Sequence, residues 1–216
     1  MSRNMKDFSV EDIYSLLIKT KSELHYLNSE GKSIPMKEKL LSGSETRTIL
    51  SGSFNPIHSA HIELVHIASK IVKKPILFEL SIKNQESTKG LLEKDELAKR
   101  ILQFKNIGDL AITNLPTFEE KSFFFKNSVF VVGYDTAMRI LDTNYYSDRL
   151  EKSIIKILSA IKKNNCSFIV AGRLHLDQFR TLKDLKIPKG FESMFKEIDQ
   201  KKFRSDQSST EIRKVF

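Results

Sequence analysis

Residues 51–61 read Ser-Gly-Ser-Phe-Asn-Pro-Ile-His-Ser-Ala-His and connect a short apolar run, 48–51, to a helical pattern over 59–72. Gly52 and Ser53 allow the backbone to turn tightly and to approach a phosphate group closely. A strand that runs through such a turn into a helix is where doubly wound α/β sheets bind their ligands. This stretch therefore predicts both the fold class and the place of a ligand site.

Strands and helices alternate along the chain from this stretch onward. The expected strands are 48–51, 75–82, 110–113, 128–132 and 167–171. The expected helices are 59–72, 93–106, 117–126, 134–141 and 148–163. Strands separated by helices of this length predict a Rossmann-like, doubly wound parallel sheet of about five strands with helices on both faces.

The part of the chain before residue 47 has a different character. Residues 9–27 carry apolar side chains at helical spacing, and residues 28–46 are polar and rich in turn-forming residues. We expect an N-terminal helical extension with its connector over 1–46, packed on a main domain that spans 47–216.

The charge of the chain favours anionic partners. Lys and Arg outnumber Asp and Glu by 36 to 27, which gives a formal net charge of +9. The lysines form doublets rather than a tract, so we expect small-molecule polyphosphate ligands and no nucleic-acid partner. Binding of nucleic acid would instead fall steeply with salt and be indifferent to His58→Ala.

Cysteine content and hydropathy indicate the compartment. Cys166 is the single cysteine, so no internal disulfide is possible, and its apolar surroundings favour a structural thiol. No segment resembles a signal peptide or a membrane span. We expect a cytoplasmic protein without membrane association.

Two histidines stand at the start of the predicted helix. His58 and His61 are three residues apart, so their rings can point to one place, and Ser59 is a candidate N-cap. A helix N-terminus attracts anions, and imidazole rings beside it can donate hydrogen bonds to phosphate oxygens. We expect a structural role for His66, further along the same helix.

A second helix start with anion-binding character lies near the end of the chain. Ser208 and Glu211 have the spacing of a capping box, and Arg213 adds a permanently charged donor on the same turn. Ser209 and Thr210 supply hydroxyl groups between them. An ordinary capped terminal helix is the competing interpretation.

A third motif, Val131–Thr136, ends an apolar strand in Gly133 and opens a helix with Asp135. Asp135 is either a helix cap or an acceptor of hydrogen bonds from a ribose or base, with Gly133 leaving room for that ligand.

These motifs resemble those of one superfamily. The stretch 51–61 is similar to the signature of the HxGH nucleotidyltransferases, which include nicotinamide mononucleotide adenylyltransferases, although Ala60 stands at the signature's glycine. Residues 208–213 resemble the superfamily's S-x-T-x-I-R signature. From residue 47 onward the chain resembles an adenylyltransferase-like branch found in fungi and in some bacteria and plants, on the segments 79–84, 130–141, 168–173 and 203–210.

The resemblance implies an in-line attack by an acceptor phosphate oxygen on the α-phosphorus of ATP, with pyrophosphate leaving. It implies His58, His61 and Arg213 as catalytic residues, with Mg²⁺ held mainly by the triphosphate and no metal ligands from the protein. The implied nucleotide-binding residues are Gly52, Ser53, Phe54, His61, Gly133, Asp135, Ser208, Ser209, Thr210 and Arg213. The implied acceptor-binding residues are Ser53, Asn84, Lys89 and Arg173.

Where the branch has Asp-Lys-Pro after Asn84, this chain has a longer loop, in which Lys89 is the candidate replacement for the lysine. For Arg173, a plain surface arginine is the competing interpretation.

We therefore expect a nicotinamide-nucleotide adenylyltransferase that forms NAD and pyrophosphate from ATP and nicotinamide mononucleotide. Adenylyl or cytidylyl transfer to another phosphorylated acceptor stays open, as does a nucleotide-binding protein that has lost its activity. The histidine pair and Arg213 argue against a loss of activity.

Overall fold

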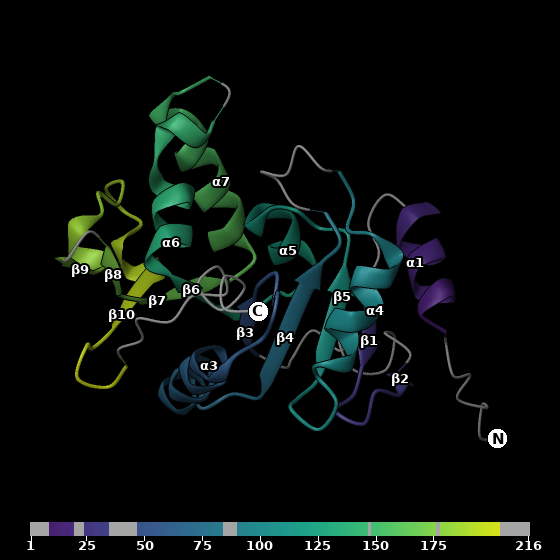
Figure 1. Ribbon diagram of the computed structural model, residues 1–216. Helices are drawn as coiled ribbons and strands as arrows, with labels where there is room; N and C mark the ends of the chain where they lie inside the picture. Colours follow the sequence, from purple (N-terminus) through teal and green to yellow (C-terminus); the bar gives the residue numbers. More distant parts are fainter. Residues whose placement is uncertain are drawn as a thin grey trace.

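The computed structural model describes residues 9–19, 24–34, 47–83, 90–146, 148–175 and 178–203. Its centre is an eight-stranded sheet with the order β10-β7-β6-β3-β4-β5-β1-β2 (Figure 1). Six strands are parallel: β3 (Thr48–Ser51), β4 (Ile76–Ser81), β5 (Leu110–Thr113), β6 (Val129–Gly133), β7 (Ser167–Ala171) and β10 (Phe195–Ile198). The predicted fold class is confirmed, although the sheet has more strands than the five expected.

The order of the parallel strands places a crevice beside β3. This strand pairs with β4 on one side and with β6 on the other. The chain moves outward from β3 through β4 to β5, then crosses to β6 and moves outward in the opposite direction through β7 to β10. Connections therefore leave β3 and β6 toward opposite faces of the sheet, and a crevice forms at the carboxyl ends of these strands.

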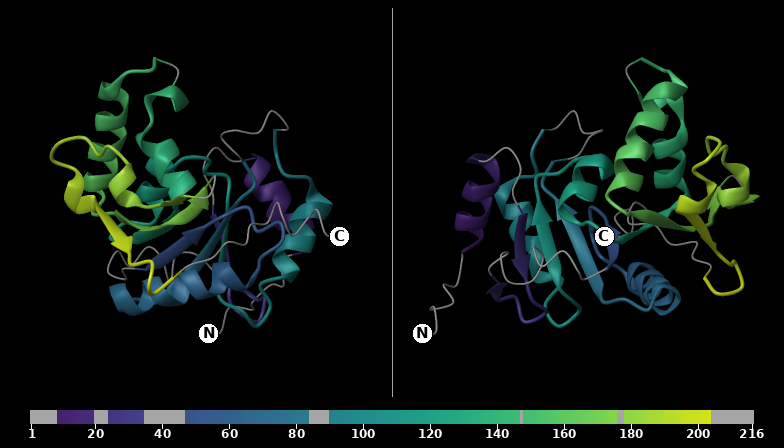
Figure 2. Two further views of the ribbon diagram at one scale, coloured as in Figure 1. Left: turned by 60° about the vertical axis from the view of Figure 1, so that its left-hand side comes forward. Right: turned by 180° about the vertical axis from the view of Figure 1, so that it is seen from behind.

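Helices cover both faces of the sheet, as the left view of Figure 2 shows for α3 below it and for α6 and α7 above it. One face carries α1 (Val10–Lys19), α3 (Ser59–Val72) and α4 (Lys94–Leu102), which share an apolar cluster with Leu50 and Phe78. The other face carries α5 (Phe118–Phe124), α6 (Tyr134–Leu141) and α7 (Glu151–Lys163), which pack over Ile49 and Leu77. Alternate strand residues thus face two separate cores. Within the described ranges, no helix has both the length and the apolar character that crossing a membrane requires.

The N-terminal region corrects one prediction. The helix expected over 9–27 ends at Lys19, and residues 24–27 form β1, which pairs antiparallel with β5 and with β2 (Ser33–Ile34). Leu27 belongs to one core, whereas Leu24 and Tyr26 belong to the other, so this segment alternates between faces as a strand does. Two leucines three residues apart fit a helix equally well, which explains the wrong prediction.

The region after β7 also holds elements that the sequence patterns did not indicate. β8 (Arg173–His175) and β9 (Gln178–Arg180) form a separate two-stranded sheet. Short 3₁₀ helices follow at Leu182–Asp184 and Glu192–Met194, and another lies earlier at Thr143–Tyr145. β10 then adds a sixth parallel strand beside β7. Its sequence, Phe-Lys-Glu-Ile, is too short and too charged to stand out as a buried strand.

A buried hydrogen bond holds the C-terminal half of α1 against the domain. The Nδ2 group of Asn114, in the loop after β5, donates to the carbonyl oxygen of Leu17 at 2.8 Å. Leu17 is fully buried and Asn114 nearly so. The bond supplies a side-chain donor to a carbonyl near the end of the helix.

Asn114→Ala removes this donor and leaves a buried carbonyl oxygen without it. We expect the free energy of unfolding to fall by about 1–3 kcal/mol, measured by urea denaturation followed by circular dichroism. Gln178→Ala, which removes an exposed carboxamide, is the control and stays within about 0.5 kcal/mol of the wild type. Equal stabilities for the two variants would contradict the role given to Asn114.

Candidate active site

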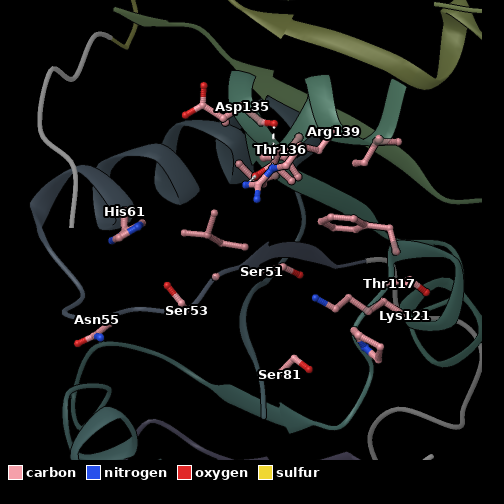
Figure 3. A pocket seen from close by; sticks show the side chains of 18 of the residues that line it. Ser51, Ser53, Asn55, His61, Ser81, Thr117, Lys121, Asp135, Thr136 and Arg139 are labelled. Atoms are coloured by element: carbon pink, nitrogen blue, oxygen red, sulfur yellow. Dashed lines mark hydrogen bonds between the residues drawn. The ribbon is translucent and has the colours of Figure 1, made fainter. Parts of the chain in front are cut away.

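A cleft of about 1230 Å³ opens at the carboxyl ends of β3, β4, β6 and β7. It lies at the crevice beside β3, where open α/β sheets bind ligands. Single-ligand pockets measure about 300–1,000 Å³, so this cleft has room for two small substrates. Figure 3 shows side chains from both faces of the sheet pointing into it.

The predicted histidine pair forms one wall of the cleft, with His61 at its edge in Figure 3. The rings of His58 and His61 lie with their centroids 3.8 Å apart and their planes tilted by 34°. The backbone N–H of His58 donates to Nδ1 of His61 at 3.3 Å. A neutral His61 therefore carries its proton on Nε2, which is then a donor. The N-cap of α3 is His58 and not Ser59, because the backbone is still extended at His58.

Two side chains of α4 and of the turn after it hold the loop between β3 and α3. The side-chain amide of Gln103 accepts from the backbone N–H of Ile57 at 2.8 Å and donates to the carbonyl of Phe54 at 3.2 Å. Arg100 donates to the carbonyl of Ser53 at 2.8 Å. Together they fix the loop backbone from two directions, which positions the histidines that follow it.

Phe54 anchors the same loop from below. Its ring is buried, with edge contacts to Phe78, Phe104 and His61, and its backbone has a φ of 46°. A Cβ atom at Gly52 would lie 2.9 Å from this ring, so a side chain at that position would displace it. The left-handed backbone is strained for phenylalanine, and burial of the ring compensates for that strain.

Burial determines the charge of the histidine pair. It lowers the pKa of His61 to about 4, with a smaller contribution from the nearby His58. Burial also lowers the pKa of His58 below its ordinary value. Both rings are therefore neutral at pH 7 in the free protein, and they act as hydrogen-bonding groups until an anion beside them favours protonation.

Two buried polar atoms on β3 and in the loop after it line the cleft and have no hydrogen-bond partner within the described part of the chain. They are Oγ of Ser51 and Nδ1 of His58. An unsatisfied buried group costs about 1–3 kcal/mol, so proteins keep such groups mainly where a ligand pairs with them.

The end of the cleft formed by β6 and β7 contains the third predicted motif. A Cβ atom at Gly133 would meet nothing within 4 Å, so the absent side chain leaves open space beside the strand end. Asp135 accepts a hydrogen bond from Arg173. Arg139, on the next turn of α6, donates to the Asp135 carbonyl at 3.2 Å and to the hydroxyl of Thr136 at 3.4 Å.

The opposite end of the cleft, formed by β4 and α5, contains an ion pair. Nζ of Lys121 lies 2.9 Å from Oε2 of Glu79, and the hydroxyl of Thr113 donates to Oε1 of the same carboxylate at 2.6 Å. Lys121 lines the cleft, and Figure 3 shows its side chain extending from α5 toward the middle of the cleft.

The structure brings most of the described candidate residues together. The cleft is lined by Gly52, Ser53, His58, His61, Gly133, Asp135 and Arg173. Phe54, expected in the nucleotide site, instead places its ring in the core. Asn84, Lys89, Ser208, Ser209, Thr210 and Arg213 lie outside the described residues, so their part in the site stays a prediction.

Four residues of the site escaped the sequence analysis: Arg100, Gln103, Lys121 and Arg139. They sit on or just after helices whose patterns looked like ordinary solvated faces. Glu79 could have drawn attention to the ion pair with Lys121, because it is the lone charged residue inside the apolar strand Ile76–Ser81.

Comparisons with known proteins agree with this geometry. Residues 49–215 match the model of the cytidylyltransferase-like family. Over 178 residues the chain is 27% identical to a protein of Schizosaccharomyces pombe named "Putative nicotinamide mononucleotide adenylyltransferase". The match covers 76% of this chain and 70% of that relative.

The pKa of His61 gives a direct test of the site. We expect the ring to titrate near pH 4 in the free protein, because burial disfavours the imidazolium ion. The unfolded chain takes up this proton near 6.5, so the ring lowers the stability of the folded state as the pH falls from 6.5 to 4. Ring resonances followed by NMR, assigned with His61→Ala, measure the midpoint, and a value near 6.5 would refute the burial argument.

Proposed function

Because this chain belongs to the cytidylyltransferase-like family, we propose that it joins nicotinamide mononucleotide to the adenylyl group of ATP. The products are NAD and pyrophosphate. The observation that carries the proposal is the pair His58 and His61, whose rings lie 3.8 Å apart at the N-terminus of α3 in a cleft large enough for two substrates. The name of the relative in Schizosaccharomyces pombe supports the choice of acceptor.

The chemistry needs no nucleophile from the protein. A phosphate oxygen of the acceptor attacks the α-phosphorus of ATP, the bond from that phosphorus to the bridging oxygen breaks, and pyrophosphate leaves with the electron pair. The protein must hold two anions in line and stabilise the charge that develops on the phosphate oxygens.

The histidine wall suits this task. Nε2 of the neutral His61 can donate to a phosphate oxygen, and the N-terminus of α3 attracts anions through the helix dipole. A bound triphosphate favours the imidazolium form, so its arrival strengthens the same hydrogen bond. Gly52 and Ser53 allow the backbone of the preceding loop to come close to the phosphates.

We assign the nucleoside part of ATP to the end of the cleft formed by β6 and β7. Gly133 leaves space there, and the carboxylate of Asp135 can accept hydrogen bonds from ribose hydroxyls. Arg173 orients that carboxylate through their ion pair, which differs from the acceptor contact that the resemblance implied for Arg173.

We assign Mg²⁺ to the triphosphate, as part of the substrate. Bound there, it would neutralise part of the negative charge of the phosphates. The described residues contain no group of three or more His, Cys, Asp or Glu side chains arranged to hold a metal ion.

Pyrophosphate release tests the proposal. Purified protein with Mg²⁺ is incubated with ATP or CTP and with nicotinamide mononucleotide or other phosphorylated acceptors. We expect release with ATP and nicotinamide mononucleotide, because the cleft can align both substrates. Release with CTP only, or with another acceptor only, would replace the assigned substrates, and no release with any pair would refute the transferase function.

The role of His61 is tested by substitution. We expect His61→Ala to lower turnover at least about a hundredfold, the loss typical for one positioned donor to a charged transition state. His66→Ala is the matched control, because this exposed ring lies on the same helix and its Nδ1 lies 2.7 Å from the carbonyl oxygen of Ile62, one turn earlier. Circular dichroism confirms that both variants fold. A near-normal rate for His61→Ala is incompatible with its assigned role.

A further inference from the structure

The ends of three neighbouring strands form a polar row beneath α5. Ser51 of β3 is the register partner of Glu79 of β4. Thr113 of β5 reaches Glu79 through its hydroxyl. These residues continue the alternation of Ile49, Leu77 and Ala111, so they point toward the face that α5, α6 and α7 cover. Three polar residues therefore replace apolar ones where this face meets the cleft.

Lys121 of α5 completes the polar row. Its side chain is 8% exposed and that of Glu79 is fully buried. The ammonium has three hydrogens, and among the described residues it contacts the Glu79 carboxylate and the ring of Phe118, 5.0 Å away. Lys121 lines the cleft, so its remaining N–H groups are donors for a bound molecule.

Ser51 adds a second donor to the same end of the cleft. Its Oγ is buried and has no hydrogen-bond partner in the described part of the chain, and the residue lines the cleft. The side chain lies beside Glu79 on the neighbouring strand. A buried hydroxyl without a partner points to a ligand group that satisfies it.

The charge of the polar row determines which ligand group fits. The carboxylate of Glu79, 2.9 Å from Nζ, neutralises the charge of Lys121. An uncharged oxygen, such as that of a carboxamide, can accept from Lys121 and Ser51 at no electrostatic cost. A ligand carboxylate would meet donors with no net positive charge and a buried negative charge directly behind them.

We propose that Lys121 and Ser51 bind an uncharged carbonyl oxygen on the non-phosphate part of the acceptor, and that Glu79 excludes acceptors with a carboxylate there. The inference rests on the proposed function and extends it to substrate selection. The polar row extends from β3 through β4 to β5, whereas Gly133, at the end assigned to the nucleoside of ATP, belongs to β6 on the other side of β3. The row is therefore separate from the nucleoside end of the cleft and is left for the acceptor.

The experiment compares nicotinamide mononucleotide with nicotinic acid mononucleotide, which differ only in carboxamide against carboxylate. The measured quantity is kcat/KM for each acceptor at saturating ATP. We expect the kcat/KM of the wild type to be at least about tenfold higher for nicotinamide mononucleotide than for nicotinic acid mononucleotide. Glu79→Gln leaves the charge of Lys121 uncompensated, so the preference falls by about tenfold or more, mainly through faster use of the acid.

Ser51→Ala is the second variant. We expect it to fold like the wild type, because the Ser51 hydroxyl has no protein partner among the described residues. We expect its melting temperature to be unchanged or raised, and its kcat/KM for the amide to fall about fivefold or more, while the KM for ATP stays constant. Lys156→Met, at an exposed lysine on α7, is the control, and we expect it to leave kcat/KM unchanged for both acceptors.

The outcomes are distinguishable. A wild type that transfers to acceptors, with an amide preference that survives Glu79→Gln and Ser51→Ala within twofold, would overturn this inference and leave the proposed function intact. A wild type that prefers the acid overturns it as well. No pyrophosphate release with either acceptor overturns the proposed function, and this inference with it.

Discussion

The position of β3 between β4 and β6 is the constraint on which the remaining structure depends. Neighbouring parallel strands are joined by crossovers, and the helices that follow β3 and β6 pack on opposite faces of the sheet, so a crevice remains between these two connections. The loop after β3 crosses the mouth of this crevice. Its path is held by Gln103 and Arg100 and by the buried ring of Phe54. The histidine wall is positioned because that loop has little freedom.

The cleft combines groups that would be unfavourable in an ordinary core. His61 is neutral because of its burial, the buried Ser51 hydroxyl has no partner among the residues that the structure describes, and Glu79 is a fully buried carboxylate. Burial of the Ser51 hydroxyl and of the Glu79 carboxylate costs folding free energy, and His61 lowers the stability only as the pH falls below 6.5. Phosphate oxygens suit the histidines, whereas the paired Lys121 suits an uncharged oxygen. Under the proposed reaction, the histidines of the cleft contact the phosphates, and Lys121 contacts an uncharged part of the acceptor.

Local patterns in the sequence were sufficient to predict a doubly wound parallel sheet, although not the order of its strands. The strand, turn and helix around residues 51–61, and the motif at Gly133, place two sides of the cleft correctly because neighbouring residues define them. The missed parts depend on contacts between distant segments. Lys121 matters because α5 lies over Glu79, some forty residues away in sequence, and β1 is a strand because β5 offers it an edge. No periodicity within 24–27 contains that information. The motif at 208–213, outside the described residues, stays a prediction.

The hairpin of β1 and β2 has a consequence for any shortened version of this protein. The family match begins at residue 49, yet β1 forms a full antiparallel ladder with Leu110–Thr113. Cutting the chain at the family boundary would strip this cover and present a row of backbone donors and acceptors flanked by Ala111 and Ile112, both fully buried in the intact fold. Bare edges of this kind recruit strands from other molecules. A trimmed catalytic unit would therefore self-associate, and its insolubility would reflect a missing neighbour rather than a defective active centre.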